Sequence, residues 1–152
     1  MKTLLAAALI ASTTIGGAHA NAPVAPADVV ISSDLQIAES ISAAPGDPVS
    51  GRDVFMNRKL GNCLACHANA DLADQPFHGE VGPVLDGVGG RYPEGLLRTV
   101  LVNPKRVFGQ QTIMPGFYVV DAGARTADKF VGKTILTAQQ LEDVIAYLQT
   151  LK

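Results

Sequence analysis

Apolar residues recur at helical spacing near the C-terminus and predict one amphipathic helix there. The apolar stripe consists of Leu141, Val144, Ile145, Leu148 and Leu151. This spacing places these side chains on one face of a helix, where they can pack into a core. Thr137 and Gln140 precede the stripe and are spaced as in a capping box. The pattern therefore predicts a helix that begins just after Thr137.

A second stretch of helical spacing lies in the middle of the chain, where residues 94–102 carry recurring apolar side chains. Pro93 precedes this stretch and suits a helix start, whereas Asn103-Pro104 follows it and stops a helix. The sequence thus predicts a helix over residues 94–102.

A third helix is predicted mainly from its capping residues. Asp47 can accept hydrogen bonds at the helix start, and Pro48 suits the first helical position, where no N–H partner is lost. The helix should run through residues 49–56. Its end is expected near Arg58-Lys59, because cations are favourable at a helix C-terminus.

The segments between these helices, mainly residues 79–91 and 109–123, are rich in glycine and proline. Strand signals are few, although residues 118–120 and their surroundings could form a short hairpin. Three helices joined by long loops bury too little surface to be stable unless something else fills the centre. We therefore expect a mainly α domain that gains from a large, flat, apolar cofactor.

The N-terminal part of the chain differs from this domain, which comprises residues 47–152. Residues 1–20 combine a basic start, a short apolar run and the small-x-small pattern Ala18-His19-Ala20, which is typical of a cleaved signal peptide. The apolar run is shorter than the roughly 20 residues of a membrane-spanning helix, so no membrane span is expected. Residues 21–46 are rich in Ala, Pro and Ser and predict an arm that lies on the domain or on a partner.

Charge and composition narrow the function further. The formal net charge is −2 at pH 7 and the chain has no basic run, so nothing suggests binding to nucleic acid or to an anionic membrane surface. One of the three histidines belongs to the predicted signal peptide, which leaves His67 and His78. Both cysteines lie in one short segment, GNCLACH, as Cys63 and Cys66.

Three kinds of site explain these cysteines poorly. Two cysteines in an exported chain usually form a disulfide, but a bridge across C-x-x-C closes a very small loop and leaves His67 unexplained. A structural zinc site needs four ligands, and adjacent Cys66 and His67 point in different directions on a helical turn. A thioredoxin-like dithiol follows a strand, whereas the segment before Cys63 is predicted as helix.

Covalent attachment of haem accounts for every residue of the motif. Two thioether bonds need cysteines about one helical turn apart, which the i, i+3 spacing of Cys63 and Cys66 supplies. The next residue, His67, can then ligate the iron, and C-x-x-C-H is the attachment signature of c-type haem. We therefore predict one haem c per chain, bound covalently through Cys63 and Cys66, with His67 as an axial ligand.

The second axial ligand has three candidates. Met114 lies on a loop that Pro115 stiffens, and we predict it as the ligand because Met/His ligation is common in small cytochromes c. Met56 lies on the predicted first helix and is more simply explained as a core residue. His78 lies in a polar loop, where a lone histidine is usually solvated.

An iron held by both His67 and Met114 has no open position for a substrate, and thioether formation leaves no nucleophilic thiol. The chain by itself is therefore predicted to carry electrons and to hold no catalytic residue. The other ring nitrogen of His67 also needs a partner. The Pro83 carbonyl is a candidate, although an ordinary turn at Gly82-Pro83 explains the same residues.

The order of these features resembles the class I cytochrome c fold, in which the first and last helices cross. Gly51 and Phe55 facing Tyr147 look like that crossing. Longer stretches resemble the SoxX family, the monohaem subunits of SoxAX cytochrome complexes, over residues 28–152. These stretches are GRDVFMNRKLGNCLACH, FHGEVGPVLDGVGGRY, VLVNPKRVFGQQTIMPGFY and FVGKTILTAQQLEDVIAYLQTLK.

The resemblance implies a role in thiosulfate oxidation. SoxAX complexes act in the periplasm as L-cysteine S-thiosulfotransferases, which join thiosulfate oxidatively to a carrier-protein cysteine on SoxYZ. The resemblance implies a heterodimer with a SoxA-type subunit, which carries the catalytic haem, and a small soluble cytochrome c as electron acceptor. On this chain it implies haem attachment to Cys63 and Cys66 and axial ligation by His67 and Met114.

Two other functions are consistent with the same residues. A free-standing periplasmic cytochrome c would share the fold and all the haem ligands, although the arm and the long region 109–133 are more elaborate than a diffusing carrier needs. A haem-based sensor would need a displaceable bond to Met114, which carbon monoxide or cyanide binding would reveal.

Overall fold

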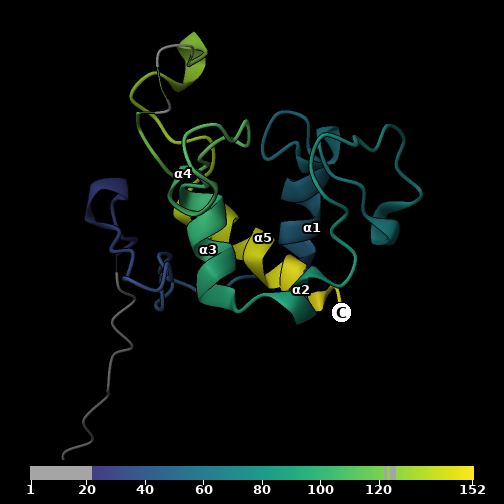
Figure 1. Ribbon diagram of the computed structural model, residues 1–152, viewed down its shortest axis with the longest axis horizontal. Helices are drawn as coiled ribbons and strands as arrows, with labels where there is room; N and C mark the ends of the chain where they lie inside the picture. Colours follow the sequence, from purple (N-terminus) through teal and green to yellow (C-terminus); the bar gives the residue numbers. More distant parts are fainter. Residues whose placement is uncertain (1–21, 122, 124–125) are drawn as a thin grey trace, which may run out of the picture.

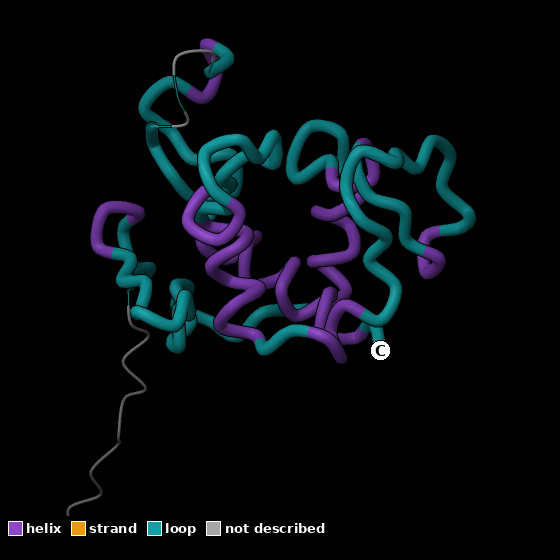
Figure 2. Tube along the Cα trace, in the orientation of Figure 1, coloured by secondary structure: helices purple, strands orange, loops and turns teal. Residues whose placement is uncertain are grey.

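The computed structural model describes residues 22–121, 123 and 126–152, so the predicted signal peptide lies outside the described residues. These residues form helices and loops, and none of them is in a strand. The α-helices are α1 (Pro48–Met56), α2 (Val88–Arg91), α3 (Glu94–Val102), α4 (Lys105–Phe108) and α5 (Ala138–Thr150) (Figure 1). Figure 2 shows the helices gathered centrally, with long loops around them.

The first and last helices cross where a glycine allows their backbones to touch. A Cβ atom on Gly51 of α1 would lie 1.8 Å from the backbone oxygen of Asp143 on α5, so only glycine permits this approach. The buried rings of Phe55 and Tyr147 meet edge to face, with centroids 5.5 Å apart. The predicted helix crossing is therefore confirmed.

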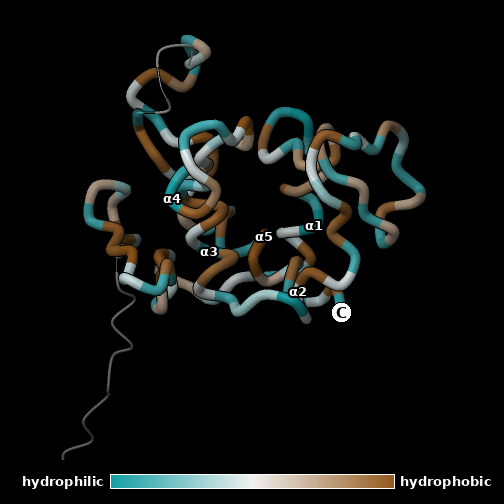
Figure 3. Tube along the Cα trace, viewed as in Figure 1, coloured by the Kyte–Doolittle hydropathy of each residue, from teal (hydrophilic) through white to brown (hydrophobic). Residues whose placement is uncertain are grey.

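The last helix begins and packs as its pattern predicts. Its capping box is complete, with the Thr137 side chain accepting from the Gln140 N–H and the Gln140 side chain accepting from the Thr137 N–H. The whole predicted stripe is buried: Leu141, Val144, Ile145, Leu148 and Leu151. Figure 3 shows apolar residues concentrated on α3 and α5, where they line the core.

The first helix begins as predicted, with the Asp47 carboxylate accepting from the N–H groups of Val49 and Ser50. Its predicted end near Arg58-Lys59 is wrong, since α1 ends at Met56. The reason is the next residue, Asn57, whose side-chain oxygen accepts from the Lys59 N–H and whose carbonyl accepts from Asn62. An Asx turn of this kind offers the backbone an alternative to the helix.

The predicted hairpin at residues 118–120 does not form. The Phe117 N–H donates to the Leu101 carbonyl at 2.9 Å, and the Leu136 N–H donates to the Phe117 carbonyl at 3.0 Å. The segment is thereby fixed between the end of α3 and the start of α5. Its backbone groups are used there and do not pair with a neighbouring strand.

Residues 88–91 are helical as α2, although they were expected to be loop. A Cβ atom on Gly89 would lie 2.5 Å from the backbone oxygen of Leu148, so this glycine lets α2 pack directly on α5. The Gly89 N–H donates to the Leu151 carbonyl at 2.9 Å. In the part of the chain that the structure describes, no helix is both long and apolar enough to cross a membrane.

Candidate haem site

The C-x-x-C-H segment forms a tight helical turn shortly after α1. Cys63 begins a 3₁₀ turn over Cys63–Ala65, and its carbonyl accepts from the N–H groups of Cys66 at 3.1 Å and His67 at 2.9 Å. Both thiols are free. The two cysteines are therefore one helical turn apart and available for two bonds to the same planar group.

A second segment, residues 79–85, lies along this turn, and we call it the proximal segment. Backbone N–H groups of the segment donate to carbonyls of the turn, from Gly79 to Leu64 (2.7 Å), from Gly82 to Cys66 (2.7 Å) and from Leu85 to Ala68 (3.0 Å). A Cβ atom on Gly79 would lie 2.1 Å from the Ala65 oxygen, and one on Gly82 would lie 2.4 Å from Cε1 of His67. Glycine is thus required at both positions for this close approach.

The proximal segment also fixes the tautomer of His67. Nδ1 of His67 lies 2.7 Å from the carbonyl oxygen of Pro83. A carbonyl can only accept, so Nδ1 carries the proton and Nε2 keeps its lone pair. This is the state in which an imidazole ligates a metal, and the hydrogen bond at Nδ1 orients the ring. Of the two explanations that the sequence left open for Gly82-Pro83, the structure shows the carbonyl contact.

The structure gives little support for the other two roles considered for the cysteines, a reactive thiol and a metal ligand. Burial raises the pKa of the Cys63 thiol to about 12, and the neighbouring Cys66 adds to the effect, so at neutral pH the thiolate is scarce. Among the described residues, no group of three or more His, Cys, Asp or Glu side chains is placed to hold a metal ion. The Cys63 thiol is therefore a weak nucleophile at neutral pH.

His78 has no ring nitrogen left for a metal. Its Nε2 lies 2.9 Å from the Leu72 carbonyl and must donate, while its Nδ1 accepts from the Asn69 N–H at 3.3 Å. His78 therefore bridges two backbone groups of the loop that follows the haem-attachment motif. Met56 packs against the core and lines a groove on the surface of about 420 Å³ together with Arg58 and Leu64.

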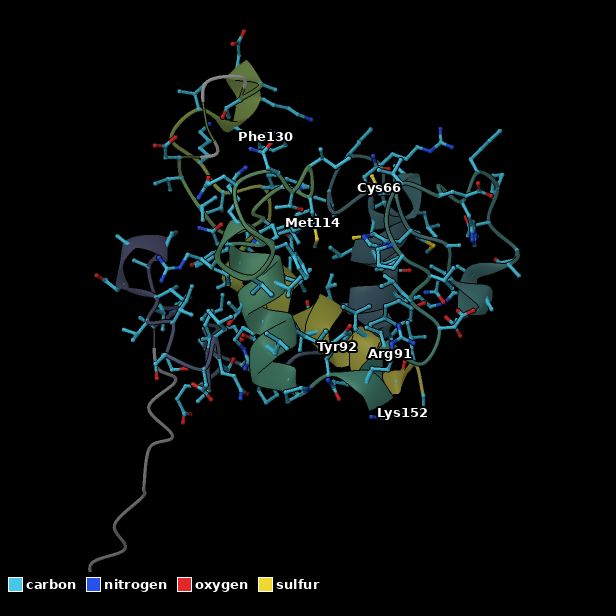
Figure 4. All side chains as sticks on the ribbon, in the orientation of Figure 1. Cys66, Arg91, Tyr92, Met114, Phe130 and Lys152 are labelled. Atoms are coloured by element: carbon cyan, nitrogen blue, oxygen red, sulfur yellow. The ribbon has the colours of Figure 1, made fainter. Side chains whose placement is uncertain are left out.

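Met114 lies on a separate loop, residues 109–116, which we call the distal loop. Its side chain is partly buried and packs against the core. In Figure 4, Met114 and Cys66 lie on opposite sides of the space between the α3–α4 half and the α1 half of the molecule. Gly116 is buried, and a Cβ atom there would lie 2.9 Å from the Val102 oxygen, so the distal loop ends in close contact with α3.

Residues 49–152 match the model of the cytochrome c family. The chain belongs to the cytochrome c family. It is 32% identical to cytochrome c2 of Rhodopila globiformis over 125 residues, which cover 73% of this chain and 99% of that protein. It is also similar to the crystal structure of SoxXA from P. pantotrophus, with 42% sequence identity and a TM-score of 0.78 over 86% of this chain and 99% of the matched chain.

Membership of the cytochrome c family confirms the predicted fold class and the predicted cofactor, a covalently bound haem c. The residues present fit that group. Two free thiols lie one turn apart, His67 keeps one nitrogen free for a metal, and the glycine at position 82 leaves room for the imidazole ring. The similarity to SoxXA likewise supports the predicted resemblance to SoxX.

Sequence reasoning missed one network of this cytochrome c. The buried side chain of Asn69, two residues after the motif, donates to the Tyr147 hydroxyl at 2.8 Å. That hydroxyl donates to the Asp71 carboxylate at 2.8 Å, and Asp71 pairs with Arg52 of α1 at 3.1 Å. The network joins the segment after His67 to both crossing helices. Only the crossing residue Tyr147 carried a sequence signal for it.

Proposed function

We propose that this cytochrome c is the electron-transfer haem subunit of a SoxXA-type complex. The observation that carries the proposal is the 42% identity to a chain of the SoxXA structure, 99% of which is covered. Its partner would be a SoxA-type haem subunit, and the complex would act as a heterodimeric L-cysteine S-thiosulfotransferase. The substrates would be thiosulfate and a SoxYZ-type carrier cysteine, with a small soluble cytochrome c as electron acceptor.

The proposed location is the periplasm. Two features of the sequence support this location. Residues 1–20 have the pattern of an export signal, and covalent haem attachment to C-x-x-C-H is typical of exported cytochromes c. In the mature chain, residues 21–46 would form the arm and residues 47–152 the cytochrome c domain.

The proposed ligand set is covalent attachment at Cys63 and Cys66 with His67 and Met114 as axial ligands. Haem c would supply a one-electron couple when bound, held by the two cysteines and by His67. The Pro83 carbonyl holds Nδ1 of His67 at 2.7 Å, so Nε2 is presented as a ligand. His78 has both nitrogens committed to backbone groups, which favours Met114 on the other side. With both axial positions taken, the subunit would have no catalytic residue of its own.

The ligand set predicts a spectroscopic outcome. Met114→Ala should abolish the charge-transfer band between methionine sulfur and ferric iron, because no other sulfur would reach the iron. Met56→Leu is the control and should keep the band. Survival of the band in Met114→Ala with its loss in Met56→Leu would assign the ligand to Met56.

The proposed complex is tested by gentle purification of the native protein from periplasm, followed by haem staining of the gel. A second, larger haem polypeptide that co-elutes in fixed ratio is the expected result. A second candidate function, a free-standing electron shuttle, is favoured by the similarity to cytochrome c2. Elution of the chain alone as a monomer would favour that shuttle over the subunit.

A further inference from the structure

The arm, residues 22–46, lies outside the part of the chain that matches the cytochrome c family. It nevertheless contributes two fully buried core residues, Ile37 and Ile41, with 4% and 2% of their surface exposed. Haem attachment and helix crossing use none of these residues. The arm therefore requires an explanation of its own.

A buried ion pair clamps the middle of the arm onto α3 and α5. Arg98 of α3 is 1% exposed and binds Glu142 of α5 through two hydrogen bonds of 2.7 and 2.9 Å. The same guanidinium donates to the Ile37 carbonyl at 2.8 Å, and the Glu142 carboxylate accepts from the Ile41 N–H at 3.0 Å. Each charge thus holds one backbone group of the arm.

The environment of Arg98 favours its charged form. Burial disfavours the charged guanidinium of Arg98, but hydrogen bonds to Glu142 and Glu94 and the charges of these carboxylates outweigh it and raise the pKa of Arg98 above its ordinary value. The guanidinium group is planar and rigid, so the groups to which Arg98 donates are held at fixed positions relative to one another.

The start of the arm reaches the segment that follows Met114. The Val24 N–H donates to the Ile41 carbonyl at 2.9 Å, which folds the start of the arm back on its clamped part. The Val24 carbonyl accepts from the Tyr118 hydroxyl at 2.7 Å. Tyr118 is 6% exposed and lies four residues after Met114.

The distal loop has few other anchors. Within the loop, the Thr112 N–H donates to the Gly109 carbonyl at 3.3 Å and the Met114 N–H donates to the Thr112 hydroxyl at 3.4 Å. Lys105 of α4 donates to the Gln110 carbonyl at 3.4 Å. Ile113, next to Met114, is 78% exposed. Beyond Gly116, the chain is held by backbone bonds to α3 and by the Tyr118 hydroxyl on the arm. Of the bonds named here, only that of Tyr118 reaches the arm.

We propose that the arm is a strap that holds the Met114 side of the site, and that Tyr118 is the positioning residue through which it acts. The inference rests on the proposed ligation by Met114. The Arg98–Glu142 clamp fixes the arm, the arm fixes Tyr118, and Tyr118 limits how far the distal loop can swing away. Loosening the strap therefore makes the methionine easier to displace without removing it.

The test uses the ferric holoprotein with imidazole as a competing ligand. Tyr118→Phe keeps the buried ring and deletes only the hydroxyl that reaches Val24. It should raise the rate of methionine displacement about three- to tenfold, the factor that corresponds to one hydrogen bond of ordinary strength. The matched control is Tyr92→Phe, which deletes the hydroxyl of an exposed tyrosine away from the arm and should leave the rate unchanged.

A double-variant cycle separates the strap from a local effect of Tyr118. Glu142→Gln weakens the clamp and should also speed displacement, although Glu142 lies on α5 away from the distal loop. If both residues act through the arm, the double variant should be slower than the product of the single effects predicts. Rates in Tyr118→Phe equal to those in Tyr92→Phe would overturn the strap.

The global stability of each variant is measured in parallel by urea unfolding. If Tyr118→Phe lowers the free energy of unfolding but leaves the displacement rate at the wild-type value, the arm stabilises the fold alone and the proposal fails. Failure of the ligand assignment is seen separately, because Met114→Ala would then keep the charge-transfer band. If Met114→Ala loses the band but Tyr118→Phe leaves the rate of methionine displacement unchanged, Met114 is the ligand and the strap proposal is wrong.

Discussion

The two sides of the proposed haem site, those of His67 and Met114, are held in different ways. On the His67 side, backbone hydrogen bonds join neighbouring segments, and the His67 ring binds the Pro83 carbonyl at 2.7 Å, 16 positions away. On the Met114 side, the Phe117 N–H donates to the Leu101 carbonyl of α3, and the anchor of longest range is the Tyr118 hydroxyl, which binds a carbonyl 94 positions away. The His67 side joins segments that are close in the sequence, whereas the Met114 side includes a contact with the arm.

The two sides also differ in the chain entropy that is lost when their contacts form. Closing a longer loop costs more chain entropy, by about 0.6 kcal/mol for each doubling of its length. The His67 side avoids most of this cost, whereas the Met114 side offsets it with a buried ion pair and two buried isoleucines. We therefore expect the Met114 side to be the first to open and the His67 side to persist.

The largest expected effect comes from breaking the clamp of the Met114 side. Arg98→Met should lower the free energy of unfolding of the holoprotein by about 3–5 kcal/mol, because it leaves the Glu142 carboxylate buried without its partner. Urea unfolding followed by circular dichroism measures this loss. Arg106→Met, at an exposed arginine, is the control and should change stability by no more than about 0.5 kcal/mol.

Removing both charges of the ion pair separates the cost of an unpaired Glu142 carboxylate from the loss of the bonds to the arm. The double variant Arg98→Met, Glu142→Leu should recover part of the loss, because no charge is left buried alone. Recovery should be incomplete, since the Ile37 carbonyl and the Ile41 N–H would both lose their partners. Full recovery would mean that the clamp contributes nothing to holding the arm.

The His67 side is the part that the sequence predicted well. C-x-x-C-H, Gly82-Pro83 and the capped last helix are short motifs, and their chemistry depends on residues that lie close together in the chain. The sequence therefore predicted haem attachment and offered the Pro83 carbonyl as a candidate partner of His67. It could not decide between a carbonyl partner and an ordinary turn, because that choice depends on how closely the proximal segment approaches the motif.

On the Met114 side, the sequence predicted Met114 as the ligand on a loop but gave no sign of what holds that loop. The ion pair of Arg98 with Glu142 joins two helices whose sequences carry no sign of their relative rotation, and charged residues are usually exposed. The contact between Tyr118 and Val24 depends on where the arm lies, which its Ala- and Pro-rich composition leaves undetermined. The hairpin predicted near Tyr118 was wrong because the long-range bonds of Phe117 outweigh local preference.

The next largest effect is expected from a substitution that pushes the proximal segment away from His67. Gly82→Ala would place a Cβ atom 2.4 Å from Cε1 of His67, so the ring or the proximal segment must shift. The expected cost is about 1–3 kcal/mol of unfolding free energy, as for other overpacked sites. Visible spectra should also show altered ligation, since the bond to Pro83 is displaced with the ring.

Gly90→Ala is the matched control for that substitution. Gly90 lies in α2, and a Cβ atom there would have no neighbour closer than the Lys152 Cδ at 4.0 Å. Its replacement should be neutral or stabilising by up to about 1 kcal/mol, because alanine restricts the unfolded chain more than glycine does. Equal losses in the two variants would show that space beside His67 is not what requires the glycine.

The smallest expected effect concerns the one long side-chain link on the His67 side, the Tyr147 hydroxyl. Burial, followed by the hydrogen bond to the Asp71 carboxylate, raises the pKa of Tyr147 above its ordinary value of 10.0. The neutral hydroxyl therefore contributes stability that is fully present below pH 10.0 and is lost as the pH rises through the higher folded value. Tyr147→Phe should cost about 1 kcal/mol at neutral pH, the net value of a typical hydrogen bond. It should also remove part of the alkaline loss of stability.

Urea unfolding at neutral pH and at a series of alkaline pH values measures both effects, with Tyr118→Phe as the counterpart on the Met114 side. Burial also raises the pKa of Tyr118, so the alkaline slope should decrease in both variants. Only Tyr118→Phe should speed displacement of the methionine, because the Tyr147 hydroxyl binds Asn69 and Asp71 near the haem-attachment motif and does not touch the arm. If Tyr147→Phe sped displacement equally, the two sides would not be held independently.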